Sequence, residues 1–493
     1  MDQYLLGIDV GTTGTKTLLF TKSGKLLAHA YRGYKNLMPQ VGWSEQNAQD
    51  WWNAVVDTVK EVCTTQEICE NVAAISLSLQ GGTVIPTDAN GNPLCNAVVW
   101  NDHRCHEEMQ EFIEEFNGDA YMYRTTGWTL GENLPALTIR WFRKNKPEIF
   151  EKAAYFLTVP DYISMKMTGI PAVDISDAGI NQLCDIEKRR YDAAILNFCG
   201  ISEEQLPKLV LSGDIIGNLT ATAAKELGLT EKTVLVAGAH DQYAVALGAG
   251  AVKSGDILIG SGTCWVVTAI SDKVDFDSGL AQSVPAVPGL WGSLESLSSG
   301  GNCLEWLRKN VAFEDGMDYD TINHEVACRK ASENGLFFYP FEGKSGENSY
   351  FTKASFIGLD MSHDRMDMAR AVMEGVVFQA IWLMEDFAAK PGKDGIILAG
   401  GASKSPVWAQ LLADISGLTV RIPEIADLAC VGAAIMAGVG CGLYPSMKEG
   451  YCSFAVKERI VQPDLEKTAL YKVLYDKYKR NAKRLKTLLE NIE

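Results

Sequence analysis

The chain has 493 residues, of which 47% are apolar and 22% are charged, and its formal net charge is −17. This length predicts two or more domains, because a single hydrophobic core does not grow to that size. The negative charge argues against broad binding to nucleic acid or to an anionic membrane, since both require basic surface. A polyanionic small molecule stays compatible, because local N–H donors and a metal ion can override the overall field.

The sequence carries no sign of membrane insertion or export. No segment reaches the roughly 18 uninterrupted apolar residues of a membrane span, and the first apolar stretch already contains Asp9, unlike a signal peptide. The 12 cysteines are scattered without C-x-x-C pairs, which is typical of free thiols in a reducing cytoplasm. Cys105 lies beside His103 and His106, but zinc would need further ligands that no second cluster supplies.

Residues 4–30 predict three strands joined by two tight turns. The first strand contains Asp9, and the turn Gly11-Thr12-Thr13-Gly14 leads into a second apolar run. This glycine spacing fits neither the P-loop nor the dinucleotide-binding fingerprint, both of which open a helix. The N–H groups of the turn can converge on an anion while Asp9 holds a metal ion that neutralises it. An ordinary hairpin with glycines for turn geometry is the alternative interpretation.

The following segments alternate between helices and strands, as in an α/β protein. Residues 47–63 predict a helix with a polar start at Asn47, residues 71–79 a buried strand, and residues 85–100 a hairpin turned by Asn90-Gly91. A loop follows this hairpin, and loops often carry functional residues. Its polar and aromatic side chains are Trp100, Asn101, Asp102 and Arg104.

An apolar strand is predicted to end at Gly238-Ala239, and His240, Asp241 and Gln242 follow it. A carboxylate at the mouth of a cleft between domains is well placed to take a proton from a substrate hydroxyl. Asp also favours the N-cap of a helix. Position alone therefore leaves both roles open for Asp241.

The second half of the chain repeats the opening pattern. Residues 255–271 again predict a strand, a Gly-Ser-Gly-Thr turn and a strand, about 250 residues after the first copy. Two such hairpins indicate duplicated domains that face each other across a cleft, with a boundary near residues 244–255. Residues 396–420 predict a strand that runs through Gly400-Gly401 into a helix, which brings backbone close to a flat ligand or a phosphate.

Several motifs in this order resemble the FGGY family of carbohydrate kinases, from about residue 4 to about residue 445. They are GIDVGTTGTK, GWSEQ, VVWNDHR, AGAHDQYAVALGAG, GSGT and LAGGASKSPVWAQLLAD, with FIGLDMSHDRMDMARAVMEGVVF similar to the C-terminal signature of the family. The resemblance implies an α/β, two-domain, actin-like fold, a duplicated ribonuclease-H-like unit with ATP and a sugar or polyol in the interdomain cleft. We expect an N-terminal domain over residues 1–245, with the sugar site and the first phosphate loop, and an ATP-binding C-terminal domain over residues 246–493.

The resemblance also implies a role for each matching residue. Asp241 is expected to be the general base, and Asp9 the acid associated with Mg²⁺. The residues expected to bind ATP and its phosphates are Gly11, Thr12, Thr13, Lys16, Gly262, Thr263, Gly301, Gly400, Gly401, Ala402 and Ser405. The residues expected to bind the substrate are Gln80, Gly81, Gly82, Trp100, Asp102, Asn133 and Gln242.

The chain departs from the family pattern where substrate specificity should reside. Xylulokinase-like members carry a Gln-Met-His run and glycerol kinases a Gln-Arg-Glu run, whereas this chain has Gln80-Gly81-Gly82-Thr83. Thr138 likewise stands where the N-terminal signature of the family has a lysine. Because the two glycines remove side-chain volume from the sugar wall, we expect poor use of glycerol and preference for a substrate of at least five carbons.

We therefore expect an ATP- and Mg²⁺-dependent carbohydrate kinase, closest in overall pattern to xylulokinase-like members, that phosphorylates a ketopentose such as D-xylulose. L-Ribulose, a deoxy-ketohexose, glycerol and gluconate are the alternative acceptors. The sequence does not fix the oligomeric state, and a homodimer is one option.

Two alternatives from other functional classes share the fold. A non-catalytic sugar or nucleotide sensor would keep the ATP cleft without the chemistry, but this chain retains Asp9, Asp241 and both Gly-Thr turns. An ATP-hydrolysing chaperone-like protein would need a separate peptide-binding module after the second domain, for which the sequence gives no sign.

Overall fold

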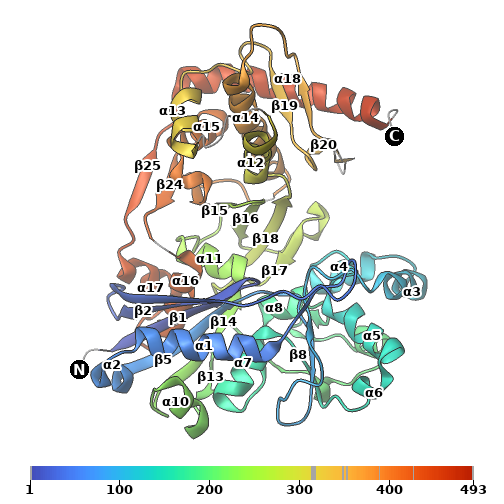
Figure 1. The fold of residues 1–493 in the computed structure, drawn as a ribbon, viewed down its shortest axis with the longest axis vertical. Coiled ribbons are helices and arrows are strands. Elements are labelled where there is room, and N and C mark those ends of the chain that lie inside the picture. The colour runs from blue at the N-terminus through green and yellow to red at the C-terminus, as the bar shows by residue number, and fades with distance from the viewer. Residues whose placement is uncertain are drawn as a thin grey trace. The chain divides into compact units, whose positions relative to one another are not determined.

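The computed structural model describes residues 3–311, 318–346, 349–350, 353–387, 389–392, 394–425 and 427–490 (Figure 1). The chain divides into two compact units. Unit 1 comprises Met1–Val252, Asp272–Gly292 and Ile425–Val456, and unit 2 comprises Lys253–Ser271, Ser293–Glu424 and Lys457–Glu493. Both units are discontinuous in sequence, and the domain boundary predicted after residue 245 stays a prediction.

Unit 1 is built on a six-stranded sheet of order β13-β14-β5-β1-β2-β3. β1 pairs antiparallel with β2 and parallel with β5, which pairs parallel with β14. The strands are β1 (Tyr4–Val10), β2 (Gly14–Thr21), β3 (Leu26–Gly33), β5 (Val72–Leu79), β13 (Ile215–Asn218) and β14 (Val234–His240). The three N-terminal strands and the buried strand over residues 71–79 are thus confirmed.

Helices cover both faces of this sheet. One face packs on α1 (Ala48–Val62), α7 (Val159–Thr168) and α10 (Ala221–Leu227), which share its apolar core. The other face packs on α16 (Leu428–Gly440). At Gly7 on β1 a Cβ atom would lie 1.9 Å from the backbone oxygen of Cys430 on α16. Only glycine permits this approach, which brings the start of α16 against β1.

The hairpin predicted over residues 85–100 is confirmed. A tight turn forms at Gly91, where φ is +77° and Asp88 N donates to Asn92 O at 3.0 Å. The two arms pair antiparallel at Val84–Val98 and at Thr87–Pro93. In addition, β6 (Ile85–Thr87) pairs with β8 (Tyr155–Leu157), and β7 (Ala97–Val98) pairs with β4 (Glu45–Gln46).

Unit 1 also has a second apolar core, formed mainly by short helices and strands between Val84 and Leu206. The other elements of unit 1 are those around this core, together with α2, which packs on the main-sheet core, and α11 and α17, which pack on α16. They are α2 (Gln66–Asn71), α3 (His106–Phe116), α4 (Ala120–Thr126), α5 (Pro135–Asn145), α6 (Pro147–Phe150), β9 (Ala172–Asp174), α8 (Ile175–Ile180), β10 (Cys184–Asp185), β11 (Arg190–Tyr191), α9 (Ala193–Cys199), η1 (Glu203–Gln205), β12 (Lys208–Val210), α11 (Asp241–Gly248), η2 (Phe276–Ser278), β17 (Ala281–Ser283) and α17 (Met447–Phe454).

Unit 2 repeats the topology of unit 1. Its central strands run in the order β18-β16-β15-β23-β24-β25, and the first five correspond to β3-β2-β1-β5-β14. β15 pairs antiparallel with β16 and parallel with β23, as β1 does with β2 and β5. The strands are β15 (Ile257–Ser261), β16 (Trp265–Ser271), β18 (Trp291–Leu297), β23 (Ile396–Gly400), β24 (Val420–Pro423) and β25 (Glu458–Val461). The duplication predicted from the two hairpins is therefore confirmed.

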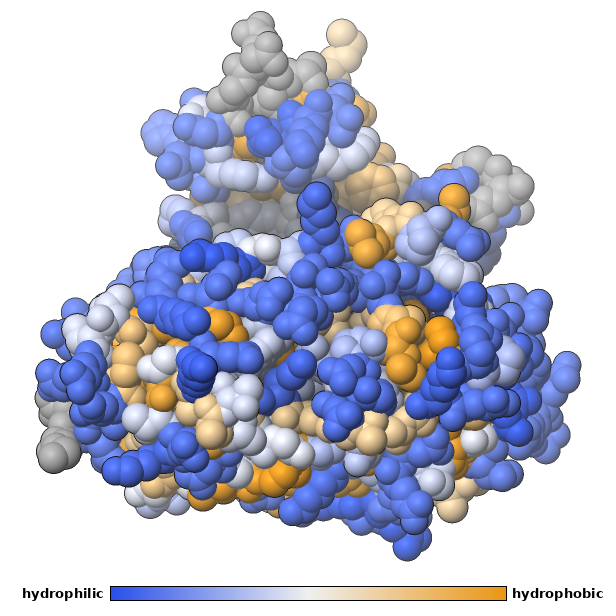
Figure 2. Space-filling view, turned by 60° about the horizontal axis from the view of Figure 1, so that its bottom comes forward, coloured by the Kyte–Doolittle hydropathy of each residue, from blue (hydrophilic) through white to orange (hydrophobic). Residues whose placement is uncertain are grey.

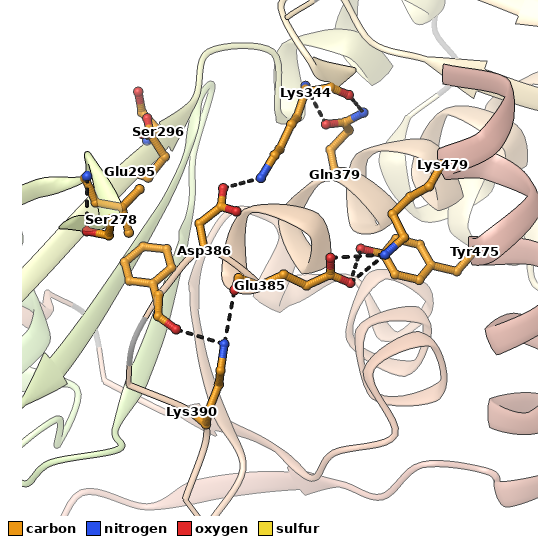
Figure 3. Close-up of polar contacts among 12 residues, drawn as sticks. Ser278, Glu295, Ser296, Lys344, Gln379, Glu385, Asp386, Lys390, Tyr475 and Lys479 are labelled. Atoms are coloured by element: carbon orange, nitrogen blue, oxygen red, sulfur yellow. Dashed lines mark hydrogen bonds and ion pairs between the residues drawn. The ribbon is translucent and has the colours of Figure 1, made fainter. Parts of the chain in front are cut away.

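The helices of unit 2 are tied together by polar contacts at the end of α14 (Figure 3). Gln379 Oε1 accepts a hydrogen bond from Lys344 N at 2.7 Å, and Glu385 accepts from Tyr475 OH and Lys479 Nζ, each at 2.9 Å. The contacts join α14 to β20 and to the C-terminal helix α18. The remaining elements are α12 (Gly301–Asn310), α13 (Tyr319–Val326), β19 (Phe337–Tyr339), β20 (Lys344–Gly346), β21 (Ser349–Tyr350), β22 (Ser355–Ile357), α14 (Arg365–Met384), η3 (Ala402–Lys404), α15 (Pro406–Ser416) and α18 (Leu465–Glu490).

The face of the molecule drawn in Figure 2 is mostly hydrophilic, and its apolar residues form small separate patches. Charged residues make up 22% of the sequence, an ordinary fraction for a globular protein. Among the helices of the described residues, none combines the length and the hydropathy that crossing a membrane requires.

Candidate active site

The first predicted phosphate loop is the turn between β1 and β2. Asp9 on β1 lies opposite Lys16 on β2 and opposite Ser78 on β5. Ser78 Oγ donates a hydrogen bond to Asp9 Oδ1 at 2.8 Å. Lys16 Nζ pairs at 2.8 Å with Asp427, which caps α16 by accepting from Cys430 N. The sheet register thus brings the predicted residues Asp9 and Lys16 together with one acid that the sequence reasoning did not include.

The surroundings of Asp9 favour a cation. Burial raises the pKa of Asp9 to about 7, and the charges of Asp427 and Asp241 add to the rise, while Ser78 and Lys16 lower it. A carboxyl group that holds its proton near neutral pH beside other acids would release it to a divalent ion. Mg²⁺ binds through one or two carboxylates together with substrate phosphates, so these residues fit the ion that the family resemblance implies.

The described residues include no group of three or more His, Cys, Asp and Glu side chains arranged to hold a metal ion. His103 and His106 contact Glu132 instead, with Nδ1 to carboxylate distances of 3.0 and 3.1 Å. Cys105 is buried, and its Sγ contacts Thr138 Oγ1 at 3.7 Å. The two histidines are thus exposed side chains that contact Glu132, while Cys105 is part of the buried core.

Asp241 is the first residue of α11, directly after β14. The N-cap of α11 is His240, whose side chain makes no capping hydrogen bond. The cap interpretation of Asp241 is therefore wrong. Its side chain is 38% exposed and its Oδ1 has no hydrogen-bond partner among the described residues, while His240 Nε2 lies 3.5 Å from that oxygen. This leaves the carboxylate able to accept a proton, and Gln242 follows it on α11.

The prediction that Gly81 and Gly82 leave an open space is wrong. A Cβ atom at Gly81 would lie 2.7 Å from His240 Cδ2 and 2.8 Å from Ile180 Cγ2. At Gly82, where φ is +71°, it would lie 3.1 Å from Trp100 Cβ. Side chains from other segments fill the volume that the glycines vacate, so the argument from volume for a larger substrate loses its basis.

The other predicted substrate residues differ in how many of their polar atoms already form hydrogen bonds within the protein. Trp100 Nε1 donates to Thr12 Oγ1 at 3.0 Å, and Asn133 Nδ2 donates to Trp100 O. Asp102 is 1% exposed, and both its oxygens accept hydrogen bonds at 2.8 Å from Arg104, so they are already engaged. Trp100 and Asn133 therefore stay next to the phosphate loop, while the role of Asp102 in substrate binding stays a prediction.

Two buried acids lie near Gly81, namely Asp174 at the end of β9 and Asp177 on α8. Asp174 caps α8 by accepting from Ser176 N at 2.9 Å. Asp177 is fully buried, and neither of its oxygens accepts a hydrogen bond from the described residues. Burial raises the pKa of Asp177 well above its ordinary value, and the charges of Asp174 and Asp241 add to the rise. Its Oδ1 lies 3.1 Å from the position that a Cβ atom at Gly81 would occupy.

Unit 2 contains a cavity of about 490 Å³ around the second hairpin. It brings together six of the predicted nucleotide residues, namely Gly262, Thr263, Gly301, Gly401, Ala402 and Ser405. Trp265, Asn302, Glu305, Tyr319, Asn323, Lys404 and Trp408 also line it. Gly400 lies just outside this lining, at the end of β23, with φ at +90°. The cavity is of the size that binds a small-molecule ligand.

Several residues of the candidate site were not predicted from the sequence. Ser78 is a polar residue within a buried strand, and Asp427 precedes a long apolar helix, so each carries a local signal. Gln46 belongs to the GWSEQ motif, but nothing local indicates that it reaches Thr12. His240 and Asp177 come close to Gly81 only through tertiary packing, for which the sequence has no local signal.

Comparison with known proteins agrees with this arrangement. Residues 4–248 match the N-terminal domain of the FGGY family of carbohydrate kinases, and residues 255–441 match its C-terminal domain. The chain belongs to the FGGY family of carbohydrate kinases. It is 30% identical to a xylulose kinase of Bacillus subtilis, over 99% of both chains, and 30% identical to a gluconokinase of the same organism, over 91% of this chain and 88% of that one.

The fold agrees as well. The crystal structure of a xylulose kinase from Rhodospirillum rubrum superposes with a TM-score of 0.90 at 25% identity, covering 99% of each chain. The FGGY protein described here therefore has the two-domain actin-like fold and is a sugar kinase that uses ATP.

Proposed function

We propose that this FGGY kinase transfers a phosphoryl group from ATP to a hydroxyl of a ketopentose, with D-xylulose as the preferred acceptor and Mg²⁺ as the required ion. The observation that carries the proposal is the different setting of two carboxylates in unit 1. Asp9 is held beside a turn suited to phosphate, whereas Asp241 is half exposed and keeps one oxygen unpaired. Carboxylates in contrasting environments are what separate charge-stabilising and proton-transfer roles.

Each residue then has a physical task. Phosphoryl transfer depends on positioning and on neutralising charge, so the N–H groups of Thr12 and Thr13 would donate to the phosphates. Gly11 N instead donates to Gly14 O within the turn, at 3.1 Å. Bound at Asp9, Mg²⁺ would supply the remaining neutralisation. Asp241 would orient the attacking hydroxyl and accept its proton, with Gln242 beside it. The cavity around Gly262 would hold the nucleoside part of ATP.

The full-length similarity to a xylulose kinase supports D-xylulose, and the charges of unit 1 favour an uncharged acceptor over gluconate. Lys16 and Arg104 are the basic side chains on the segments that carry the predicted site. Lys16 pairs with Asp427, and Arg104 pairs with Asp102 and Glu45. The carboxylate of gluconate would be repelled by the acids of this region. Both basic side chains already form ion pairs, so neither is free to bind it.

A panel of acceptors tests the proposal. ADP release should be measured with D-xylulose, L-ribulose, a deoxy-ketohexose, glycerol and D-gluconate, with and without Mg²⁺. We expect the highest kcat/KM with D-xylulose, and no turnover after Mg²⁺ is chelated. A higher kcat/KM with D-gluconate would replace D-xylulose as the acceptor. Absence of a phosphorylated product from every compound would overturn the proposal for this class of substrates.

A further inference from the structure

The first phosphate loop is held from outside by three side chains. The carbonyl oxygens of Gly11–Thr13 accept hydrogen bonds, in chain order, from Tyr34 OH, from Gln46 Nε2 and from Tyr31 OH. In a trans peptide the carbonyl and the N–H of the following residue point in opposite directions. Fixing three consecutive carbonyls on one side therefore turns the following N–H groups to the other side, where they are set to meet an anion.

Gln46 is the member of this set that also reaches the sugar wall. Its Nε2 donates to Thr12 O at 2.6 Å, and its Oε1 accepts from Trp51 Nε1 at 2.9 Å and from Gln80 Nε2 at 3.1 Å. The side chain is buried, with 1% of its surface exposed. Because the indole N–H can only donate, it fixes which end of the Gln46 amide carries the oxygen. The amide therefore has one orientation, with its nitrogen toward the phosphate loop.

Gln80 has one polar atom left over. The residue is 3% exposed, and Gln80 Oε1 has no hydrogen-bond partner among the described residues. A buried acceptor without a donor costs free energy, so it indicates a ligand group that donates to it. Sugar hydroxyls are such donors. Trp100, on the same wall, reaches the phosphate loop directly through Thr12 Oγ1.

We propose that Gln46 is a positioning residue that couples acceptor binding to the setting of the first phosphate loop, an inference that rests on the proposed function. A hydroxyl bound to Gln80 Oε1 fixes the Gln80 amide, which fixes Gln46 and, through it, the peptide of Thr12. A bound acceptor therefore tightens the binding of the ATP phosphates. ATP tightens acceptor binding by the same factor, because a coupling free energy is reciprocal.

Titration calorimetry with a non-hydrolysable ATP analogue, with and without saturating D-xylulose, measures this coupling. For the wild type we expect the dissociation constant of the analogue to fall by roughly 5-fold or more on adding D-xylulose. Gln46→Met removes both ends of the amide, and the two dissociation constants should then differ by less than about 2-fold. Gln46→Glu keeps an oxygen for Trp51 but sets a second one against Thr12 O, so the coupling should also be lost.

The matched control is Gln49→Met, the same change at the start of α1, where the side-chain amide donates to Asn53 Oδ1 at 3.0 Å. It should keep the wild-type coupling. Thermal unfolding of each variant separates loss of coupling from loss of fold, and Gln46→Glu serves if Gln46→Met does not fold. The inference is overturned if a folded Gln46 variant keeps the wild-type coupling, or if the wild type itself shows no coupling.

Failure of the proposed function is a different result, because in that case the enzyme would turn over no acceptor in the panel.

Discussion

The hairpins β1–β2 and β15–β16 share their topology but differ in what holds the turn. In unit 2 the carbonyls of Gly262 and Thr263 accept hydrogen bonds from backbone N–H groups at the start of α12, those of Gly301 at 3.3 Å and Asn302 at 3.1 Å. In unit 1 the corresponding carbonyls are held by side chains. A single substitution can therefore loosen the first turn, whereas the second is held by bonds that no side-chain change removes.

The hairpins also differ in charge. Asp9 stands two residues before Gly11, and Gly260 stands two residues before Gly262. The carboxylate next to the turn thus belongs to unit 1 alone, and so does Asp241. Unit 2 offers instead the cavity of about 490 Å³. The same strand pairing is thus accompanied by carboxylates in one unit and by a cavity in the other. Under the proposed function, the largest effects on turnover should come from acids of unit 1.

Asp241→Asn should give the largest effect. The amide keeps the size of the side chain but cannot take a proton, so kcat should fall by about 10²- to 10⁴-fold, which is the usual contribution of a general base. The affinity for ATP should change little, because the cavity proposed to hold the nucleoside lies in unit 2. Steady-state kinetics with the preferred acceptor, and calorimetry with an ATP analogue, check both parts. Retention of more than about a tenth of the wild-type kcat would show that Asp241 only positions the substrate.

Asp9→Asn should reduce kcat by about 10²- to 10³-fold, because it removes charge stabilisation next to the phosphate loop. The matched change in unit 2 is Gly260→Ala, where φ is not positive and the nearest atom to an added Cβ is Val266 O at 3.7 Å. This control should leave kcat nearly unchanged. Comparable losses from the two variants would mean that the hairpins contribute through their shape alone.

Much of the fold follows from local patterns. Apolar runs on both sides of Gly11–Thr13 and Gly262–Cys264 predict the two hairpins, and the structure contains both as antiparallel pairs. The hairpin over residues 85–100 follows as well, since its arms pair antiparallel. Its further partners β4 and β8 do not follow, because strands of two or three residues also pair with whichever segment packs beside them. The sequence pattern thus predicts a strand more reliably than it predicts all the strands with which that strand pairs.

The candidate site shows the same limit. Asp9 and Asp241 can be singled out because each is an acid at the end of an apolar run, next to glycines or a helix start. The surroundings of Gly81 cannot be read in this way. His240 reaches Gly81 because it lies beside Leu79 in the pairing of β14 with β5, a contact that no local pattern specifies. A glycine in the sequence therefore suggests open space beside the backbone, whereas in the structure other side chains fill that space.

Tyr34→Phe tests whether side chains really set the first turn. It removes the donor to Gly11 O, and a net loss of about 0.5–1.5 kcal/mol should raise the KM for ATP by about 2- to 10-fold. Tyr31→Phe should have a smaller effect, because Thr13 O also accepts from Tyr34 N at 3.2 Å. Measuring the KM for ATP in both variants, at saturating acceptor, decides the point. A larger effect from Tyr31→Phe would contradict this account of the turn.

The last effect concerns buried acids, acts on stability rather than on turnover, and depends on pH. Glu374 in unit 2 is buried but accepts from Arg370 Nε at 2.7 Å and from Ser332 N at 3.0 Å. Asp177 in unit 1 accepts no hydrogen bond from the part of the chain that the structure describes, and burial raises its pKa well above the ordinary value. An acid whose pKa is raised by folding keeps its proton in the folded state at a pH where the unfolded chain has lost it. Folding then requires proton uptake, so the free energy of unfolding falls as pH rises above about 4.

Asp177→Asn removes this requirement, because the amide has a similar shape and does not ionise. The free energy of unfolding of the variant, minus that of the wild type, should therefore increase with pH, by at most about 1.4 kcal/mol per pH unit above pH 4. The increase should continue until the pKa of Asp177 in the folded protein is reached. Urea unfolding of both proteins at pH 5, 6 and 7 measures the difference. A difference that is constant across this range would mean that Asp177 is ionised in the folded protein and that an unrecognised donor or cation meets its charge.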